Sequence, residues 1–230
     1  MKRPAIFIII VLVVVFSIFV KESLSLNTPD TDDIVAFWRF NECGNKSSPP
    51  VVLDSSKHNN NGVVTGAKWG KGKDGCGLVF DGNDYVRVDD SDSLDVRDGI
   101  TIEAWINLDG FSQEWNNIVR KNVNPLEDRY NLRVGGCLCG GEFILNIGGG
   151  LKFLFFPYNF ESRRWYHIAA QYDGTQMKVF VNGELISSLS TSGPIASDGS
   201  DLYIGVGHLT TSEFYRGKMD EVKISSIALY

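Results

Sequence analysis

The stretch at residues 164–186, RWYHIAAQYDGTQMKVFVNGELI, decides the fold class. Within it, Met177, Val179 and Val181 alternate with residues that are mostly polar, so one face of an extended segment is apolar. This period of two is typical of a half-buried β-strand. The dipeptide Asn182-Gly183 follows, and both positions tolerate the positive φ angles of a two-residue hairpin turn. The stretch therefore predicts two antiparallel strands, with the second returning over residues 184–187.

The same alternation recurs along the chain. Ile100, Ile102 and Ile106 share one face of another predicted strand, which the turn pair Asp98-Gly99 opens. From residue 34 onward no long segment has apolar residues at helical spacing, and turn signals recur about every 8 to 12 residues. This pattern predicts an all-β domain. Further strands are expected near residues 36–40, 78–80, 85–88, 117–120, 130–134, 143–147, 166–172, 202–206 and 219–224.

The composition is that of one globular, turn-rich domain. The chain has 230 residues, of which 43% are hydrophobic and 12% aromatic, with 24 glycines. Its net charge is −6, because 22 Lys and Arg residues are scattered among 28 Asp and Glu residues. Nucleic-acid binding needs clustered basic side chains. The composition therefore excludes a nucleic-acid partner and favours calcium, neutral sugars or proteins.

The N-terminal residues differ from the rest of the chain. Lys2 and Arg3 precede an unbroken apolar run at residues 5–20, which is typical of an export signal. As a helix the run would span about 24 Å, slightly less than a hydrocarbon core. A cleaved signal peptide and a signal anchor over residues 1–25 both remain open, and only the anchor would touch the membrane. Residues 26–33 are predicted to form a tether, and residues 34–230 one extracytoplasmic domain.

Six segments in a fixed order carry a family resemblance. They are AFWRFNE from residue 36, VLDSSKHNNNGVVTGAKWGKGKDGCGLVFDGNDYVRVDDSDSLDV from 52, GITIEAWI from 99, the stretch at 164–186, LYIGVG from 202 and GKMDEVKISSIAL from 217. Together they resemble the laminin G-like jelly roll domains of the concanavalin A-like lectin and glucanase superfamily. The resemblance implies a two-sheet antiparallel β-sandwich, a jelly roll whose sheets pack face to face. It leaves the ligand open, because this fold hosts many functions.

The four cysteines favour disulfides over a metal site in an exported chain. Three pairings are possible, and we favour Cys43 with Cys76, which stand at positions usually small or glycine in the family. Cys137 and Cys139 would then pair with each other or stay reduced. Asn45 heads an N-glycosylation triplet, which we take only as a surface marker.

Calcium is the expected cofactor. Loops rich in Asp, Asn and Gly supply the oxygens that calcium requires, and Asp54 opens such a loop, DSSKHNNNG. The resemblance implies an ion held between this loop and Asp220 on the last strand, with Asp81 contributing. The alternative is that Asp54 and Asp81 cap turns and Asp220 is a solvated strand residue.

Aromatic side chains outside the strand patterns are the candidate ligand platform. A flat ring stacks on a sugar or anchors a protein contact. Burial under a loop is the alternative for each of them. The candidates are Trp115, Tyr158, Phe160, Phe214 and Tyr215.

The sequence shows no catalytic acid pair of the glucanase kind. Such a pair needs two carboxylates at alternate positions of one strand. Glu103 and Glu142 each lack a carboxylate two residues later, and Asp220 and Glu221 are adjacent and face opposite ways. The leading hypothesis is therefore a non-catalytic recognition module for carbohydrate or a cell-surface protein. A structural component of an envelope assembly is the alternative, and a glycoside-processing enzyme the third.

Overall fold

A computed structural model of the chain describes residues 31–44, 50–110, 115–122, 128–135, 140–207 and 213–230. The predicted signal segment at residues 1–25 and most of the tether lie outside these ranges. Within these ranges there is no helix that is both long and apolar enough to cross a membrane. Nearly all regular structure in them is β-strand.

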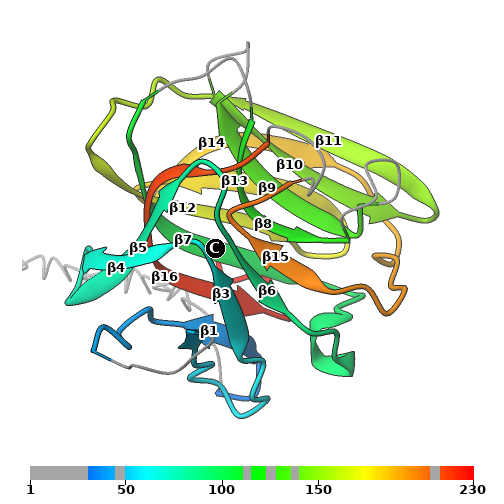
Figure 1. Ribbon diagram of the computed structural model, residues 1–230. Coiled ribbons are helices and arrows are strands. Elements are labelled where there is room, and N and C mark those ends of the chain that lie inside the picture. The colour runs from blue at the N-terminus through cyan, green and yellow to red at the C-terminus, as the bar shows by residue number, and fades with distance from the viewer. Residues whose placement is uncertain (1–30, 45–49, 111–114, 123–127, 136–139, 208–212) are drawn as a thin grey trace, which may run out of the picture.

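The strands form two antiparallel sheets that pack face to face (Figure 1). The strands are β1 (Ile34–Trp38), β2 (Val51–Val52), β3 (Gly62–Thr65), β4 (Lys68–Lys71), β5 (Cys76–Asp81), β6 (Tyr85–Val88), β7 (Ile100–Leu108), β8 (Trp115–Lys121), β9 (Tyr130–Gly135), β10 (Gly140–Ile147), β11 (Gly150–Pro157), β12 (Trp165–Tyr172), β13 (Gln176–Val181), β14 (Glu184–Ser190), β15 (Leu202–Ile204) and β16 (Arg216–Ser225). The first sheet runs β14-β13-β12-β7-β16-β5-β4, with β1 paired to β16, and the second runs β11-β10-β9-β8-β15-β6-β3-β2.

The core lies between the sheets and consists of alternate strand residues. On β7, Ile102 and Ile106 point inward, and on β10 Phe143 and Leu145 do the same; all four are fully buried. Burying one such side chain contributes about 1.5–3 kcal/mol. The two-sheet antiparallel sandwich predicted from the sequence is confirmed.

The predicted hairpin is also confirmed. β13 pairs with β14, and Val181 lies opposite Glu184 across the turn. Asn182 has φ +51° and Gly183 φ +82°, the left-handed conformation that a two-residue turn of this kind requires.

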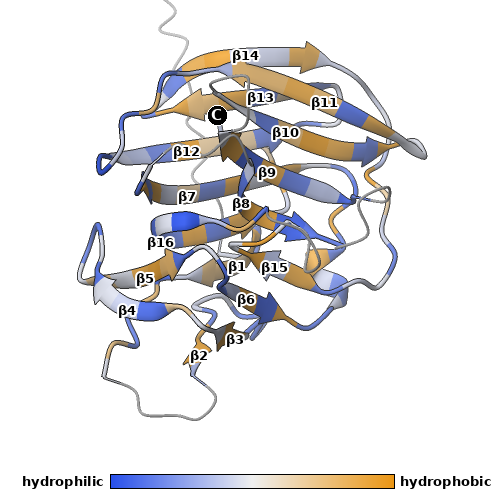
Figure 2. Cartoon of the chain, turned by 45° about the horizontal axis from the view of Figure 1, so that its top comes forward, coloured by the Kyte–Doolittle hydropathy of each residue, from blue (hydrophilic) through white to orange (hydrophobic). Residues whose placement is uncertain are grey.

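Four strands were not expected from the sequence. β2, β3 and β4 have two to four residues each, too few to show an alternating pattern. β11 has the sequence GLKFLFFP, in which apolar residues occupy both faces and hide the period of two. Figure 2 shows the apolar character of β11 at the edge of its sheet.

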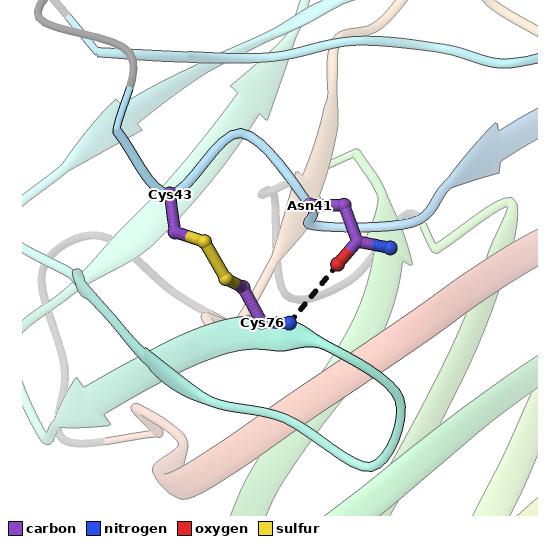
Figure 3. Close-up of a disulfide and its surroundings, with 3 residues drawn as sticks. All are labelled: Asn41, Cys43 and Cys76. Carbon is purple, nitrogen blue, oxygen red and sulfur yellow. Dashed lines mark hydrogen bonds between the residues drawn. A yellow bond between two sulfur atoms is a disulfide. The ribbon is translucent and has the colours of Figure 1, made fainter.

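The disulfide between Cys43 and Cys76 is confirmed. It links the segment after β1 to the first residue of β5, with the two Cα atoms 6.1 Å apart. Beside it, the Asn41 side-chain oxygen accepts the Cys76 backbone N–H at 3.0 Å (Figure 3). Cys137, Cys139 and the Asn45 triplet lie outside the described residues.

Candidate functional site

The candidate site is the outer face of four neighbouring strands of the second sheet, β8 to β11. Alternate residues of β9, β10 and β11 enter the core, which leaves their other residues on the outer face. We call this set the β8–β11 face. Its members are Trp115, Asn117, Arg120, Asn131, Arg133, Glu142, Ile144, Phe153 and Phe155.

A bulge in β8 places two polar residues on this face. The register shifts between Asn117 and Val119, so Ile118 and Val119 both enter the core while Asn117 and Arg120 both face outward. Gly207 lies close by, where a Cβ atom would come within 2.1 Å of the Asn117 amide nitrogen. The backbone can approach β8 this closely only because Gly207 has no side chain.

Strand pairing sets the order of the side chains across the face. Phe155 lies opposite Glu142, Glu142 opposite Arg133, and Arg133 opposite Asn117. Neighbouring strands are about 4.8 Å apart, so this row is about 14 Å long. A second row, further along the strands, consists of Phe153, Ile144, Asn131 and Arg120.

Arg133 is held from three sides. Its Nε donates to Glu142 Oε2 at 2.8 Å, and its Nη1 donates to Glu213 Oε1 at 3.3 Å. The Trp115 ring lies under the guanidinium, 4.3 Å from Cζ to the ring centroid. Glu213 comes from the segment before β16, so a residue from outside the four strands lies over the face. Arg133 is therefore fixed in one orientation by two carboxylates and one ring.

Arg120 and Asp128 form a second, more deeply buried ion pair. Arg120 Nε lies 2.5 Å from Asp128 Oδ1, and their side chains are 3% and 6% exposed. Arg120 also donates to the Gly207 carbonyl. Burial raises the pKa of Asp128, although the neighbouring Arg120 guanidinium opposes this shift. A buried pair of this kind depends on both partners, because either charge alone would be left without compensation.

Several amide atoms on and beside this face lack a hydrogen-bond partner. The side-chain oxygens of Asn131, Asn117 and Asn146 are buried and unpaired, whereas the Asn131 amide group also hydrogen-bonds to the Asp128 carboxylate. Leaving a buried polar atom unpaired costs about 1–3 kcal/mol. Such atoms in a native structure call for a bound water, ion or ligand. The face thus offers hydrogen-bond acceptors that the described residues leave unused.

Two phenylalanines form the accessible edge of the face. Phe153 is 44% exposed and Phe155 is 50% exposed, and both lie on the edge strand β11. Phe155 is the cross-strand neighbour of the buried Glu142. The arrangement therefore combines an open aromatic surface with a polar floor, which is the composition of many small-ligand sites.

The predicted aromatic residues differ in burial and in location. Trp115 is half buried and belongs to the β8–β11 face, and Phe214 is half buried next to Glu213. Tyr158 is half buried, with its ring 4.7 Å from that of Phe160 between centroids.

The expectation of exposed rings is corrected for Phe160 and Tyr215. Phe160 is 5% exposed and packs edge-to-face on Tyr166. Tyr215 is fully buried, packs edge-to-face on Phe80, and its hydroxyl donates to the Lys218 carbonyl at 3.0 Å. Each ring is buried because it packs in the core against a ring of another strand, Phe160 against Tyr166 on β12 and Tyr215 against Phe80 on β5.

Asp54 is surrounded by donors from its own loop and from β1. Its Oδ1 accepts the N–H groups of Phe37 and Ser56, each at 2.8 Å. Its Oδ2 accepts the Ser56 hydroxyl at 2.6 Å and the Asn60 N–H at 2.8 Å. The four bonds use the oxygen lone pairs that a metal would need.

Asp220 and Asp81 lie in different surroundings from Asp54. Asp220 accepts N–H groups from Lys73, Asp74 and Glu221 at 2.8–2.9 Å, and burial raises its pKa despite these bonds. Asp81 is exposed, at the last residue of β5. Across the described part of the chain, no group of three or more His, Cys, Asp or Glu side chains is placed to hold a metal. In the described structure, the carboxylate oxygens of the three aspartates do not come together as one set of metal ligands.

Sequence reasoning missed most of this face. From the sequence, Glu142 can be compared only with residues of its own strand, which offers no second carboxylate. Its partner Arg133 lies on the neighbouring strand. Glu213 is 80 residues from Arg133 in sequence. Phe153 and Phe155 lie in a run whose apolar residues give no sign of which ones are exposed. Cross-strand geometry, and no local pattern, brings these residues together.

Comparisons with known proteins agree with this architecture. A laminin G family model, described as the concanavalin A-like lectin/glucanases superfamily, matches residues 80–230. No curated protein matches the chain in sequence. Among solved structures, domain 4 of AbnA, a GH43 extracellular arabinanase from Geobacillus stearothermophilus solved with arabinotriose, is similar with a TM-score of 0.68 and 17% identity. The similarity covers 86% of this chain and 94% of that one.

Two toxin domains are similar to the same extent. They are the binding domain of Paraclostridial Mosquitocidal Protein 1, with a TM-score of 0.66 and 16% identity, and the receptor-binding domain of a botulinum neurotoxin C/D mosaic serotype, with 0.65 and 15%. Each match covers 87% of this chain but only 50% and 49% of the toxin chain. At these identities the similarity establishes the shared fold alone.

Proposed function

Because the chain belongs to the concanavalin A-like lectin/glucanase superfamily, we propose that it is a non-catalytic, extracytoplasmic recognition module that binds carbohydrate on the β8–β11 face. The observation that carries the proposal is the buried, unpaired side-chain oxygen of Asn131 on the same sheet face as the exposed rings of Phe153 and Phe155, which lie two strands away.

A sugar fits both parts of this face. Its hydroxyl groups donate hydrogen bonds, as the unpaired amide oxygens of Asn117 and Asn131 require. Its ring presents an apolar C–H surface to an aromatic side chain, and Phe155 offers such a side chain at 50% exposure. A protein partner with a purely apolar contact would use the rings and leave the amide oxygens unpaired.

A binding role is favoured over catalysis by the state of the carboxylates. A glycosidase needs one carboxyl that can hold a proton and a second that is free to attack or to activate water. Here Glu142 and Glu213 both bind the Arg133 guanidinium, and Asp128 binds Arg120. The carboxylates of this face are therefore engaged in positioning arginines.

An extracytoplasmic location is supported by the disulfide. The Cys43–Cys76 bond is of a kind that persists in oxidising compartments and is rare in the cytosol. The similar arabinanase is described as extracellular. The apolar run at residues 5–20 would provide the export signal.

Calcium binding by Asp54, Asp81 and Asp220 stays a separate proposal. Under this proposal calcium stabilises the folded chain and raises its thermal midpoint. The stabilisation is about 2.7 kcal/mol when calcium is at a hundredfold excess over its dissociation constant. Asp220→Asn should remove that rise. If Asp54 and Asp220 act only as acceptors for backbone N–H groups, the midpoint would be the same in calcium and in chelator.

The test of the proposed function is a glycan array followed by titration calorimetry on the best glycan. Phe155→Ala should weaken binding at least tenfold, because stacking on an exposed ring is lost. Val63→Ala is the matched control: Val63 is 42% exposed at the other end of the same sheet and should leave affinity unchanged. Absence of binding to every glycan, or equal effects of the two variants, would contradict the proposal.

A further inference from the structure

The β8–β11 face and the two residues that lie over it contain more negative than positive charges. The cationic groups are Arg120 and Arg133, and the anionic groups are Asp128, Glu142 and Glu213. Each guanidinium is already paired with at least one carboxylate. Among the described residues of this face, a ligand therefore finds no uncompensated positive charge.

The accessible charge is also negative. The Glu213 side chain is 28% exposed, whereas those of Arg133 and Arg120 are 15% and 3% exposed. The carboxylate thus lies nearer to solvent than the guanidinium groups behind it. Because the site is partly closed to water, a ligand carboxylate here would be repelled more strongly than at an open surface.

Resting on the proposed function, we infer that the β8–β11 face selects neutral sugars over acidic ones, with Glu213 as the residue that excludes the acidic sugars. The unpaired amide oxygens accept hydrogen bonds that a neutral sugar donates, and Glu213 sets a penalty only on ligands that carry a carboxylate, sulfate or phosphate. Glu213 is a specificity residue in this scheme, and Asn131 and Phe155 provide the affinity.

Arg133 makes the scheme testable by a gain of binding. Its Nη1 is bonded to Glu213, while Nε and Nη2 are bonded to Glu142. In Glu213→Gln the carboxylate charge is gone and Nη1 has no charged partner, but Glu142 still holds the guanidinium in place. The variant should therefore accept an acidic sugar that the wild type rejects.

The experiment compares matched glycans that differ by one acidic residue. The full chain is titrated with lactose and 3′-sialyllactose, and on an array with neutral oligosaccharides and their uronic-acid counterparts. We expect the wild type to bind the neutral member at least tenfold more strongly, and Glu213→Gln to reduce this ratio to about threefold or less. Glu184→Gln removes an exposed carboxylate on the other sheet and should leave the ratio unchanged.

A second measurement needs no variant. Salt screens the repulsion, so raising the ionic strength from 0.05 to about 0.5 M should strengthen wild-type binding of the acidic member and leave the neutral one unchanged. Stronger binding of acidic glycans by the wild type, or an unchanged ratio in a folded Glu213→Gln protein, would overturn the inference. If neither kind of glycan binds, the proposed function itself is wrong.

Discussion

The two sheets each carry a polar network on the outer face, and the two networks differ in how completely they are satisfied. On the first sheet, Glu103 contacts Lys223 at 2.5 Å and His167 at 3.4 Å, and it accepts the Tyr230 hydroxyl. Gln171 accepts the N–H groups of residues 229 and 230 at 3.1 and 2.7 Å. On the second sheet, the side-chain oxygens of Asn117 and Asn131 are buried with neither a hydrogen bond nor an ion pair.

This difference separates a network that is satisfied within the fold from the one that we propose contacts a ligand. Satisfied buried networks fix a conformation, whereas unpaired buried groups cost free energy and persist where they serve a function. We therefore expect substitutions in the Glu103 network to affect stability alone. Removal of an amide with an unpaired oxygen on the β8–β11 face should affect binding, with little loss of stability.

The largest effect is expected where the β8–β11 face does support the fold, at its buried ion pair. Arg120→Ala leaves the Asp128 carboxylate buried without a cation and should reduce the free energy of unfolding by about 3–5 kcal/mol. Urea denaturation measures this. Arg164→Ala removes a solvent-exposed pair with Glu161 and should change stability by less than about 0.5 kcal/mol. Similar losses for the two variants would show that the buried pair has no special role.

The Glu103 network should make stability depend on pH. Burial opposes the charge of Glu103, but hydrogen bonds from His167, Lys223 and Tyr230 outweigh it and lower its pKa to about 2. Because the folded pKa lies below the unfolded value of about 4.3, the contribution is fully present above that value. It is lost as the pH falls from about 4.3 through 2.

Glu103→Gln measures this contribution directly. We expect it to cost about 2–3 kcal/mol at pH 7 and progressively less below about pH 4.3, because there the carboxyl of the unfolded chain binds a proton while that of the folded protein stays ionised down to about pH 2. Denaturation of both proteins at pH 7, 4 and 2.5 gives the profile. A difference that does not shrink as the pH falls would mean that the charge of Glu103 is not what stabilises this face.

Gln171 provides a smaller effect in the same network. It is fully buried, and its side chain both donates to and accepts from the backbone of residues 229 and 230. Gln171→Leu keeps a similar volume but leaves two N–H groups without their acceptor, which should cost about 1–3 kcal/mol. Hydrogen exchange at residues 229 and 230 should become faster. Unchanged exchange there would show that these bonds do not hold the segment on the sheet.

Sequence predicted the fold because its determinants are local. The alternation in β7 and β13 and the turn at Asn182-Gly183 lie within a few neighbouring residues, and the structure confirms them. Where a strand is very short, as β2 is, or apolar on both faces, as β11 is, the period of two cannot be read and the strand was missed.

The candidate site could be predicted only at Trp115, because the remaining contacts join residues that are distant in sequence. The polar loop around Trp115 indicated an accessible ring, and that residue does lie on the β8–β11 face. Tyr215 had the same local appearance but is enclosed by Phe80 and by the backbone of Asn107 and Lys218. Burial of a loop aromatic depends on which strands it meets, which sequence spacing does not specify.

Asn131→Leu tests the central claim most directly. It replaces an amide whose oxygen is buried and unpaired with an apolar side chain of similar volume. The account predicts that the unfolding free energy changes by less than about 1 kcal/mol, because the loss of the hydrogen bond to Asp128 is offset when an unpaired polar atom is no longer buried. It also predicts that binding to the best glycan on the array falls at least tenfold. Loss of stability comparable to that of Gln171→Leu, with glycan binding intact, would contradict it.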